Sequence, residues 1–246
     1  LAYVLKGKAG ERLLDSYSQE RAPVAKQIVT RANRSIEEFG PIFKALGLLD
    51  SVDPVKMQEN MDARCNDTPE AELQRAAIRE AIAYKVYEFD AHGVEMNHRY
   101  RSDAVVTDGQ PEPGFEKDAE LHFQQTTWPG ARLPHAWLFG KDGQKVSTLD
   151  LTGHGAFTIL TGIGGDGWIE AAKALGKEFG LPITVHKIGP RQEWQDLVGD
   201  WANAREIRDS GALLVRPDHH VAWRAEGLAA DPKSELRRVL KSILSK

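Results

Sequence analysis

The order of strand and helix patterns in the second half of the chain is the strongest constraint on its fold. Strand patterns at residues 156–161 and 183–188 flank a helical pattern at 167–179, and such a βαβ unit has parallel strands. The patterns that follow are a helix, two strands joined by a turn, and a closing amphipathic helix, at residues 192–207, 212–216, 221–224 and 232–244. This order predicts an α/β domain that begins near residue 115.

A parallel βαβ unit followed by an antiparallel hairpin and a final helix matches a thioredoxin-like arrangement, with helices on both faces of the sheet. Asp142-Gly143, between strand candidates at residues 136–139 and 145–149, predicts one further hairpin. Thiol–disulfide chemistry needs a thiolate at the start of the first helix, usually with a resolving partner. The only cysteine, Cys65, lies about a hundred residues upstream of that helix. The predicted domain therefore lacks CxxC and the redox activity that depends on it.

The first half of the chain has a different pattern. Residues 10–110 have helical spacing, with Pro23 and Gly40-Pro41 expected to stop or kink helices and Thr68-Pro69 expected to start one. The segment Gln110–Gly114 is typical of a linker. We therefore predict a helical segment at residues 1–110 and a thioredoxin-like domain at residues 115–246. Leu1, Val4 and Leu5 have helical spacing without a start signal, which favours a chain that continues from missing upstream sequence.

Charge and hydropathy exclude several classes of protein. The 246 residues include 32 Lys and Arg against 36 Asp and Glu, a net charge of −4, so no basic face for a nucleic acid is expected. No apolar run approaches the roughly 18 residues that span a bilayer. We expect a cytoplasmic protein.

The segment Gly162–Gly167 fits the GxGxxG pattern, follows a predicted strand and opens a predicted helix. A dinucleotide site also needs an acidic residue about 20 positions later, at the end of the next strand. That window holds no carboxylate, and only Arg191 is available for a 2′-phosphate. A tight turn between strand and helix is the favoured interpretation, and an NADP-binding reductase remains an alternative.

No other constellation carries chemistry. His219 and His220 are adjacent on a strand and point to opposite faces, while His92, His98, His135 and His154 match no metal-binding spacing. No GxSxG element is present. We therefore assign no catalytic, cofactor-binding or metal-binding residue within this sequence.

Four stretches resemble FAD-dependent aromatic hydroxylases. Leu13–Ala25 resembles the family's L-x-x-Y-x-x-E-R-x-P-x-A signature, and Gly211–Arg224 resembles its terminal segment, with His219 where glycine is usual. Asn97–Val106 and Trp128–Trp137 are most similar to the branch of 2,4-dichlorophenol 6-monooxygenase and phenol 2-monooxygenase. The resemblance covers nearly the whole chain in the right order and identifies it as the C-terminal portion of such an enzyme.

The resemblance implies a flavoprotein that uses FAD, NADPH and O₂ to hydroxylate a phenol ortho to its hydroxyl group, most readily 2,4-dichlorophenol. The FAD and NADPH sites and the catalytic residues would lie upstream of Leu1. Tyr17, Glu20, Arg21 and Pro23 match the signature, where they are expected to fix the helix beneath the flavin domain. The terminal domain is expected to form subunit contacts, so we predict a homo-oligomer assembled through residues 115–246.

The residues leave two other functions open. The chain could be a non-catalytic structural or oligomerisation module built on a thioredoxin-like fold. It could also be a standalone reductase that binds NADP through Gly162–Gly167.

Overall fold

A computed structural model describes all residues from 1 to 246. The chain forms two compact units that are each discontinuous in sequence. Unit 1 consists of residues 1–23, 96–116 and 124–246, and unit 2 of residues 24–95 and 117–123. These compact units divide the chain at other positions than the predicted linker at residues 110–115. The division into two domains at that linker stays a prediction.

A four-stranded sheet forms the centre of unit 1, in the order β4-β3-β6-β7. Strands β3 (Phe157–Thr161) and β4 (Ile183–Lys187) run parallel, joined by helix α8 (Asp166–Phe179), as the βαβ pattern predicts. Strand β6 (Ala212–Val215) lies antiparallel to β3 and to β7 (Val221–Ala225). This mixed helix and sheet architecture is the α/β class expected from the sequence.

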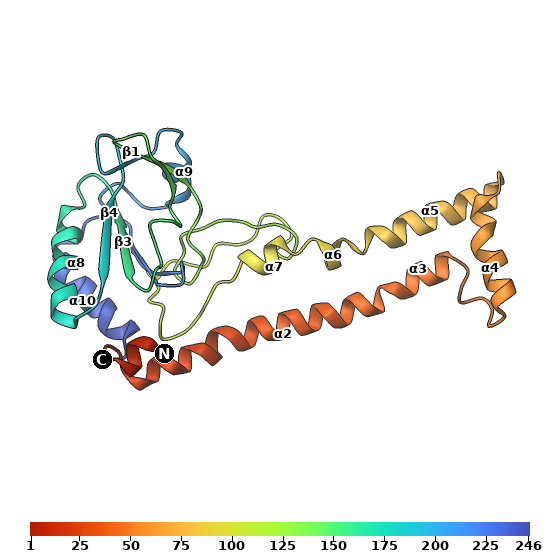
Figure 1. The fold of residues 1–246 in the computed structure, drawn as a ribbon, viewed down its shortest axis with the longest axis horizontal. Coiled ribbons are helices and arrows are strands. Elements are labelled where there is room, and N and C mark those ends of the chain that lie inside the picture. Colours follow the sequence, from red (N-terminus) through yellow and green to blue (C-terminus); the bar gives the residue numbers. More distant parts are fainter. The chain divides into compact units, whose positions relative to one another are not determined.

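The two faces of this sheet have different covers. Figure 1 shows α8 and α10 (Pro232–Ile243) side by side along one face. Ile159 of β3 and Leu214 of β6 point into this core, with Trp168 of α8 packed edge-on against Trp223 at 5.3 Å. Leu160 and Leu213, the next residues on the same strands, enter the core on the other face. The alternation buries both faces of the sheet.

A second sheet of three strands, in the order β2-β1-β5, contributes to that other core. Strands β1 (Trp137–Gly140) and β2 (Lys145–Ser147) form the hairpin predicted around Asp142-Gly143. The single helix predicted at 192–207 is wrong: the segment contains β5 (Trp194–Gln195) and the short helix α9 (Asp200–Ala204). The Asp196 carboxylate accepts hydrogen bonds from the backbone N–H groups of Gly199 and Ala202, and this local turn replaces a continuous helix.

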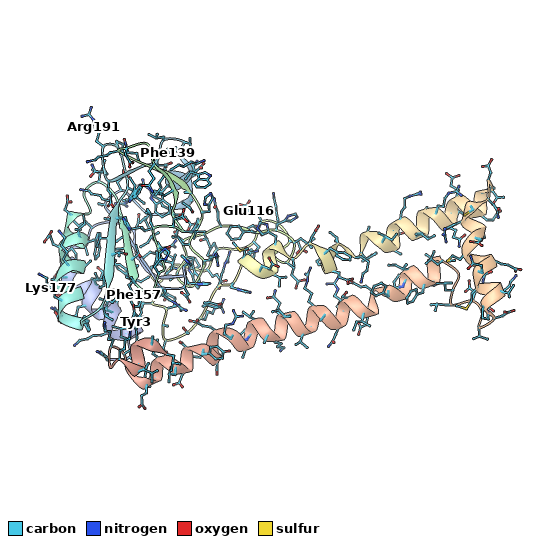
Figure 2. The ribbon with its side chains drawn as sticks, viewed as in Figure 1. Tyr3, Glu116, Phe139, Phe157, Lys177 and Arg191 are labelled. Carbon is cyan, nitrogen blue, oxygen red and sulfur yellow. The ribbon has the colours of Figure 1, made fainter.

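The first residues of the chain belong to unit 1. Helix α1 (Ala2–Leu5) brings Tyr3 against Phe157, with ring centroids 5.8 Å apart (Figure 2). The Tyr3 hydroxyl donates to the carbonyl of Gly155 at 2.6 Å, and the N–H of Gly10 donates to the carbonyl of Leu244 at 2.8 Å. The beginning and the end of the chain are therefore parts of one core.

Unit 2 is helical. Its elements are the later part of α2 (Asp15–Glu37), then α3 (Phe39–Ala45), α4 (Pro54–Asp62), α5 (Pro69–Ala83), α6 (Val86–Phe89) and most of α7 (His92–Met96), with a short 3₁₀ turn at Ala63–Cys65 before α5. The 3₁₀ turn at Glu11–Leu14, which precedes α2, belongs to unit 1. The Thr68 hydroxyl caps α5 by accepting from the N–H of Ala71 at 3.2 Å, as Thr68-Pro69 predicts. Helix α2 continues through Pro23, so a stop there is wrong, while the break predicted at Gly40-Pro41 falls at residue 38, between α2 and α3. A proline inside a helix loses its own hydrogen bond and crowds the carbonyl four residues before it, and α2 continues on both sides of Pro23 despite this cost.

Polar contacts hold the two segments of unit 2 together. Arg31 forms an ion pair with Glu120 at 2.7 Å, and the Tyr87 hydroxyl donates to Asp118 at 2.6 Å. Lys85 is buried and donates to the carbonyl of Ser35 at 2.8 Å. None of the helices combines the length and apolar character needed to cross a membrane.

Candidate functional site

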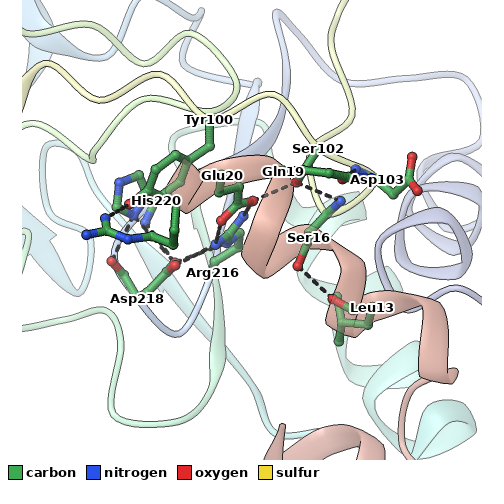
Figure 3. A network of polar contacts seen from close by, with 12 residues as sticks. Leu13, Ser16, Gln19, Glu20, Tyr100, Ser102, Asp103, Arg216, Asp218 and His220 are labelled. Carbon is green, nitrogen blue, oxygen red and sulfur yellow. Dashed lines mark hydrogen bonds and ion pairs between the residues drawn. The ribbon is translucent and has the colours of Figure 1, made fainter. Parts of the chain in front are cut away.

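The stretches that carry the family resemblance meet in one polar network within unit 1 (Figure 3). Glu20 comes from the start of α2, Ser102 and Tyr100 from the segment after α7, and Arg216 and Asp218 from the β6–β7 turn. Glu20 and Arg216, which bond directly, lie 196 positions apart in sequence. Sequence reasoning did not predict that the stretches would meet, and no local pattern signals the pairing.

Glu20 and Arg216 form the centre of the network. The Arg216 guanidinium donates from both terminal nitrogens to the Glu20 carboxylate, with Nη1–Oε1 at 2.5 Å and Nη2–Oε2 at 2.9 Å. The Glu20 side chain is 6% exposed and the Arg216 side chain is 11% exposed. The Ser102 hydroxyl donates a further hydrogen bond to Glu20 Oε1 at 2.6 Å. This bidentate, shielded geometry is the strong form of an arginine–carboxylate pair.

Aromatic stacking extends the network. The ring of Tyr100 stacks on His220 with centroids 4.4 Å apart, and its hydroxyl accepts a hydrogen bond from Arg21 Nη1 at 2.8 Å. Arg216 lies over the same ring, 5.7 Å from its centroid. Glu20 and Arg21, the acid and base of the signature, thus contact two different segments of unit 1, while Tyr17 is exposed.

Trp128–Trp137, the fourth stretch of the resemblance, reaches the network through Gly130. The N–H of Tyr100 donates to the Gly130 carbonyl at 2.9 Å, and the N–H of Gly130 donates to the carbonyl of Val221 at 2.7 Å. Gly130 has φ of +100°, and a Cβ there would lie 2.1 Å from the Tyr100 carbonyl oxygen. Only glycine fits between these two segments.

Asp218 completes the network on the β6–β7 turn. Its carboxylate accepts from Arg216 Nη2 at 2.5 Å and Nε at 3.1 Å, and it lies 3.6 Å from His220 Nδ1. Burial alone would raise the pKa of Asp218, but the hydrogen bond with His220 and the charge of Arg216 outweigh it and hold that pKa well below its usual range. Asp218 is therefore a carboxylate in the folded protein at neutral pH.

The lowered pKa of Asp218 predicts a loss of stability in acid. Its ionised form stabilises the fold above the unfolded pKa of about 3.9, and this contribution disappears as the pH falls through the lower, folded pKa. We expect Asp218→Asn to lower the free energy of unfolding at pH 7 and to matter progressively less below about pH 4. Urea unfolding of both proteins across pH 2–7 measures this, with exposed Asp67→Asn as the control. A difference between Asp218→Asn and the parent that stays constant down to pH 2 would contradict it.

The Glu20–Arg216 pair at the centre of the network joins the start of α2 to the β6–β7 turn. Both oxygens of Glu20 accept hydrogen bonds from Arg216, and Oε1 also accepts from Ser102. An arginine stays protonated throughout the physiological range. The charged groups are therefore occupied by one another, and their chemistry is structural.

The Gly162–Gly167 turn does not fit a dinucleotide. A Cβ at Gly165 would lie 1.9 Å from Thr161 Oγ1, and one at Gly162 would lie 2.6 Å from the carbonyl oxygen of Asp209. The glycines are thus filled by the protein itself, where a pyrophosphate would need open backbone. Asp166, in the first turn of α8, pairs with Lys187 at 2.7 Å and would repel a phosphate. Near the start of the chain, the side chains of Ser16, Gln19 and Glu20 each form a hydrogen bond within the chain.

Because the turn is filled, NADPH is not expected to bind there. We expect no saturable quenching of tryptophan fluorescence by NADPH, after correction for its absorbance with N-acetyltryptophanamide. Trp168, on the helix that follows the turn, is the reporter. Saturable quenching at micromolar NADPH that Arg191→Ala abolishes would instead support the reductase alternative.

The histidines do not assemble a metal site. No group of three or more His, Cys, Asp or Glu residues could hold a metal ion. His219 accommodates φ of +65°, a conformation that favours glycine, and this explains why glycine is usual at its position. Its Nδ1 lies 2.9 Å from the Thr152 hydroxyl, and burial, followed by the charge of Arg132, lowers the pKa of its imidazole.

Family models match both ends of the chain. Residues 126–246 match the model described as aromatic-ring hydroxylase, C-terminal, and residues 1–32 match an FAD binding domain. The second match covers α1 and the part of α2 that carries Glu20 and Arg21. The Glu20–Arg216 pair therefore joins the segments matched by the two models.

Relatives align over the whole chain. It is 51% identical over 245 residues to 2,4-dichlorophenol 6-monooxygenase from Delftia acidovorans, covering 100% of the chain and 42% of that protein. It is 48% identical over 240 residues to phenol 2-monooxygenase from Pseudomonas sp. (strain EST1001), covering 98% of the chain and 39% of that protein. The chain thus spans about two fifths of the length of these curated relatives.

A solved structure agrees with the fold. The flavin-dependent monooxygenase PieE, in complex with FAD and substrate, superposes with a TM-score of 0.89 at 46% identity, covering 99% of this chain and 42% of PieE. The chain therefore belongs to the aromatic-ring hydroxylase family, with residues 126–246 as its C-terminal domain.

Proposed function

We propose that this chain works as the C-terminal part of a flavin-dependent monooxygenase that hydroxylates phenols ortho to the hydroxyl group. The preferred substrate is 2,4-dichlorophenol, converted to a chlorocatechol with NADPH as reductant and O₂ as oxygen donor. The main support for this proposal is the sequence identity of 48–51% to 2,4-dichlorophenol and phenol monooxygenases over almost the whole chain. FAD supplies the oxygen-transfer chemistry when bound.

The contribution of this chain is to hold the helix that leaves the FAD-binding segment. Glu20 and Arg21 lie on the residues that match the FAD binding domain, and Arg216 and Tyr100 hold them in unit 1. The sheet has one parallel and two antiparallel strand pairings, which supports a thioredoxin-like domain. This domain would be the rigid part to which Glu20 and Arg21 are bound. We also propose that residues 115–246 form the contacts of a homo-oligomer, which sedimentation at micromolar concentration tests.

The decisive experiment is to sequence the coding DNA upstream of the Leu1 codon and to assay the protein encoded by the complete open reading frame. We expect a frame that continues upstream and a product that binds FAD and consumes NADPH in response to 2,4-dichlorophenol. A stop codon and initiation signal immediately before Leu1 would favour a non-catalytic structural or oligomerisation module. A full-length flavoprotein that oxidises NADPH without forming a catechol from any phenol would overturn the assigned reaction.

A further inference from the structure

Helix α2 exposes an apolar side along the part of its length that belongs to unit 2. The apolar residues that recur there at helical spacing are Ala25, Ile28, Val29, Ala32 and Ile36. All five are exposed, and the three larger side chains are 50%, 59% and 72% exposed in chain order. These five residues form a continuous surface on one side of the helix, the α2 stripe.

The opposite side of α2 is polar and makes the contacts of the helix within unit 2. Arg31 pairs with Glu120 at 2.7 Å and donates to the carbonyl of Asp90 at 3.0 Å. The guanidinium of Arg34 lies over the ring of Tyr87, 4.6 Å from its centroid. An amphipathic helix normally turns its apolar side toward a core and its polar side toward water. In α2 this arrangement is reversed, so the α2 stripe is the side that lacks a partner.

Unit 2 has little apolar core of its own to cover this surface. The buried residues of both hydrophobic core clusters lie in unit 1. Within unit 2 the buried apolar residues are Val24, Ala71, Ala81 and Val94, and two of these are alanines. Helices in proteins gain most of their stability from the packing of an apolar face. The α2 stripe is therefore suited to packing against a further folded domain.

The match to a family model indicates which domain this is. The model of the FAD binding domain matches residues 1–32, which include four of the five residues of the α2 stripe. A domain model describes residues that fold together, so the apolar positions of this helix are expected to pack into the domain described by the model. The chain covers only 42% of the related 2,4-dichlorophenol 6-monooxygenase. The remaining length of such an enzyme is long enough for an FAD-binding domain.

We propose that the α2 stripe is the docking surface for an FAD-binding domain encoded upstream of Leu1. This inference rests on the proposed function, because it requires a full-length flavoprotein. The docked domain buries the apolar side of α2, while Arg31 and Arg34 on the other side bind unit 2. Ile28 and Val29 supply apolar area to this interface, and Ala32 allows the docked element to approach the helix closely.

The experiment measures how fast a maleimide modifies two neighbouring positions of α2 in the protein encoded by the complete open reading frame. Val29→Cys lies in the α2 stripe, and Thr30→Cys is the matched control because Thr30 is also exposed but lies outside the stripe. Both are made with Cys65→Ser, which removes the exposed native thiol, and modification is followed by mass spectrometry of the peptide from residues 27–31. We expect Val29→Cys to react at least about 10-fold more slowly than Thr30→Cys, because modification requires transient undocking. In the 246-residue chain we expect the two variants to react at similar rates.

Two results would overturn the docking surface. One is an equal rate for the two variants in the full-length protein. The other is slow modification of Val29→Cys in the 246-residue chain that becomes faster on dilution, because a second copy of the chain would then cover the stripe.

Catechol formation by the same full-length protein tests the proposed function separately. A protein that forms a catechol but leaves Val29→Cys as reactive as Thr30→Cys has the proposed function without this docking surface. A protein that protects Val29→Cys but forms no catechol has the docking surface without the proposed reaction. A coding sequence that begins at the Leu1 codon overturns both.

Discussion

Replacing Arg216 by methionine is expected to lower the free energy of unfolding by about 3–5 kcal/mol. Methionine replaces the guanidinium with an apolar side chain of similar length. The Glu20 carboxylate then stays shielded from solvent but has lost its bidentate partner. Removing one member of a buried ion pair has a cost of this size because the remaining charge is uncompensated. Urea unfolding at pH 7 measures the effect.

The exposed pair between Arg208 and Glu226 provides the matched control. Its side chains are 75% and 72% exposed, so Arg208→Met is expected to change stability by less than about 1 kcal/mol. The double variant Glu20→Gln with Arg216→Met separates pairing from desolvation, because it removes the unpaired charge and is expected to recover part of the lost stability. A loss from Arg216→Met no larger than that from Arg208→Met would show that the network is not a structural lock.

Gly130→Ala is expected to destabilise unit 1 by about 3 kcal/mol or more. The new methyl group would lie 2.1 Å from the Tyr100 carbonyl oxygen, and alanine is strained at the Gly130 φ of +100°. Relieving the clash requires separating the two backbones and breaking the hydrogen bond from the Tyr100 N–H to the Gly130 carbonyl. Thermal unfolding followed by near-ultraviolet circular dichroism reports the loss.

Gly143→Ala isolates the backbone contribution to that effect. Gly143 has φ of +82°, close to that of Gly130, but a Cβ there meets no atom within 4 Å. The strained φ alone is expected to cost about 1 kcal/mol. If both variants lose the same amount, the close approach of Gly130 to Tyr100 contributes nothing to stability.

The periodic elements of the fold could be predicted from sequence because their signals are local. The spacing of Leu236, Val239, Leu240 and Ile243 predicts the buried face of α10, and all four residues are buried in the core. The helix predicted at residues 192–207 is wrong because the Asp196 side chain accepts hydrogen bonds from nearby backbone N–H groups and forms a local turn. Helix α2 was predicted to break because proline signals a boundary locally, whereas its context sustains the helix.

The candidate site could be predicted only in its parts. The stretches containing Glu20 and Arg216 were singled out from their motifs, but no spacing rule pairs residues 196 positions apart. The sequence likewise gave no sign that the indole of Trp128 would be shielded without an acceptor. Both features arise from tertiary packing between segments, which a pattern within one segment does not contain.

The packing of Gly10 against Leu244 sets an order for the synthesis of this protein. Residues 1–23 are made before the partners that hold them, which are Arg216 and Leu244 at the end of α10. Unit 1 therefore does not complete its core until α10 has been made, while most of unit 2, residues 24–95, is already available to fold. Contacts this distant along the chain also slow folding, because a long loop must close before they form. A nascent chain that stops before α10 is thus expected to leave α1 without its partner residues in unit 1.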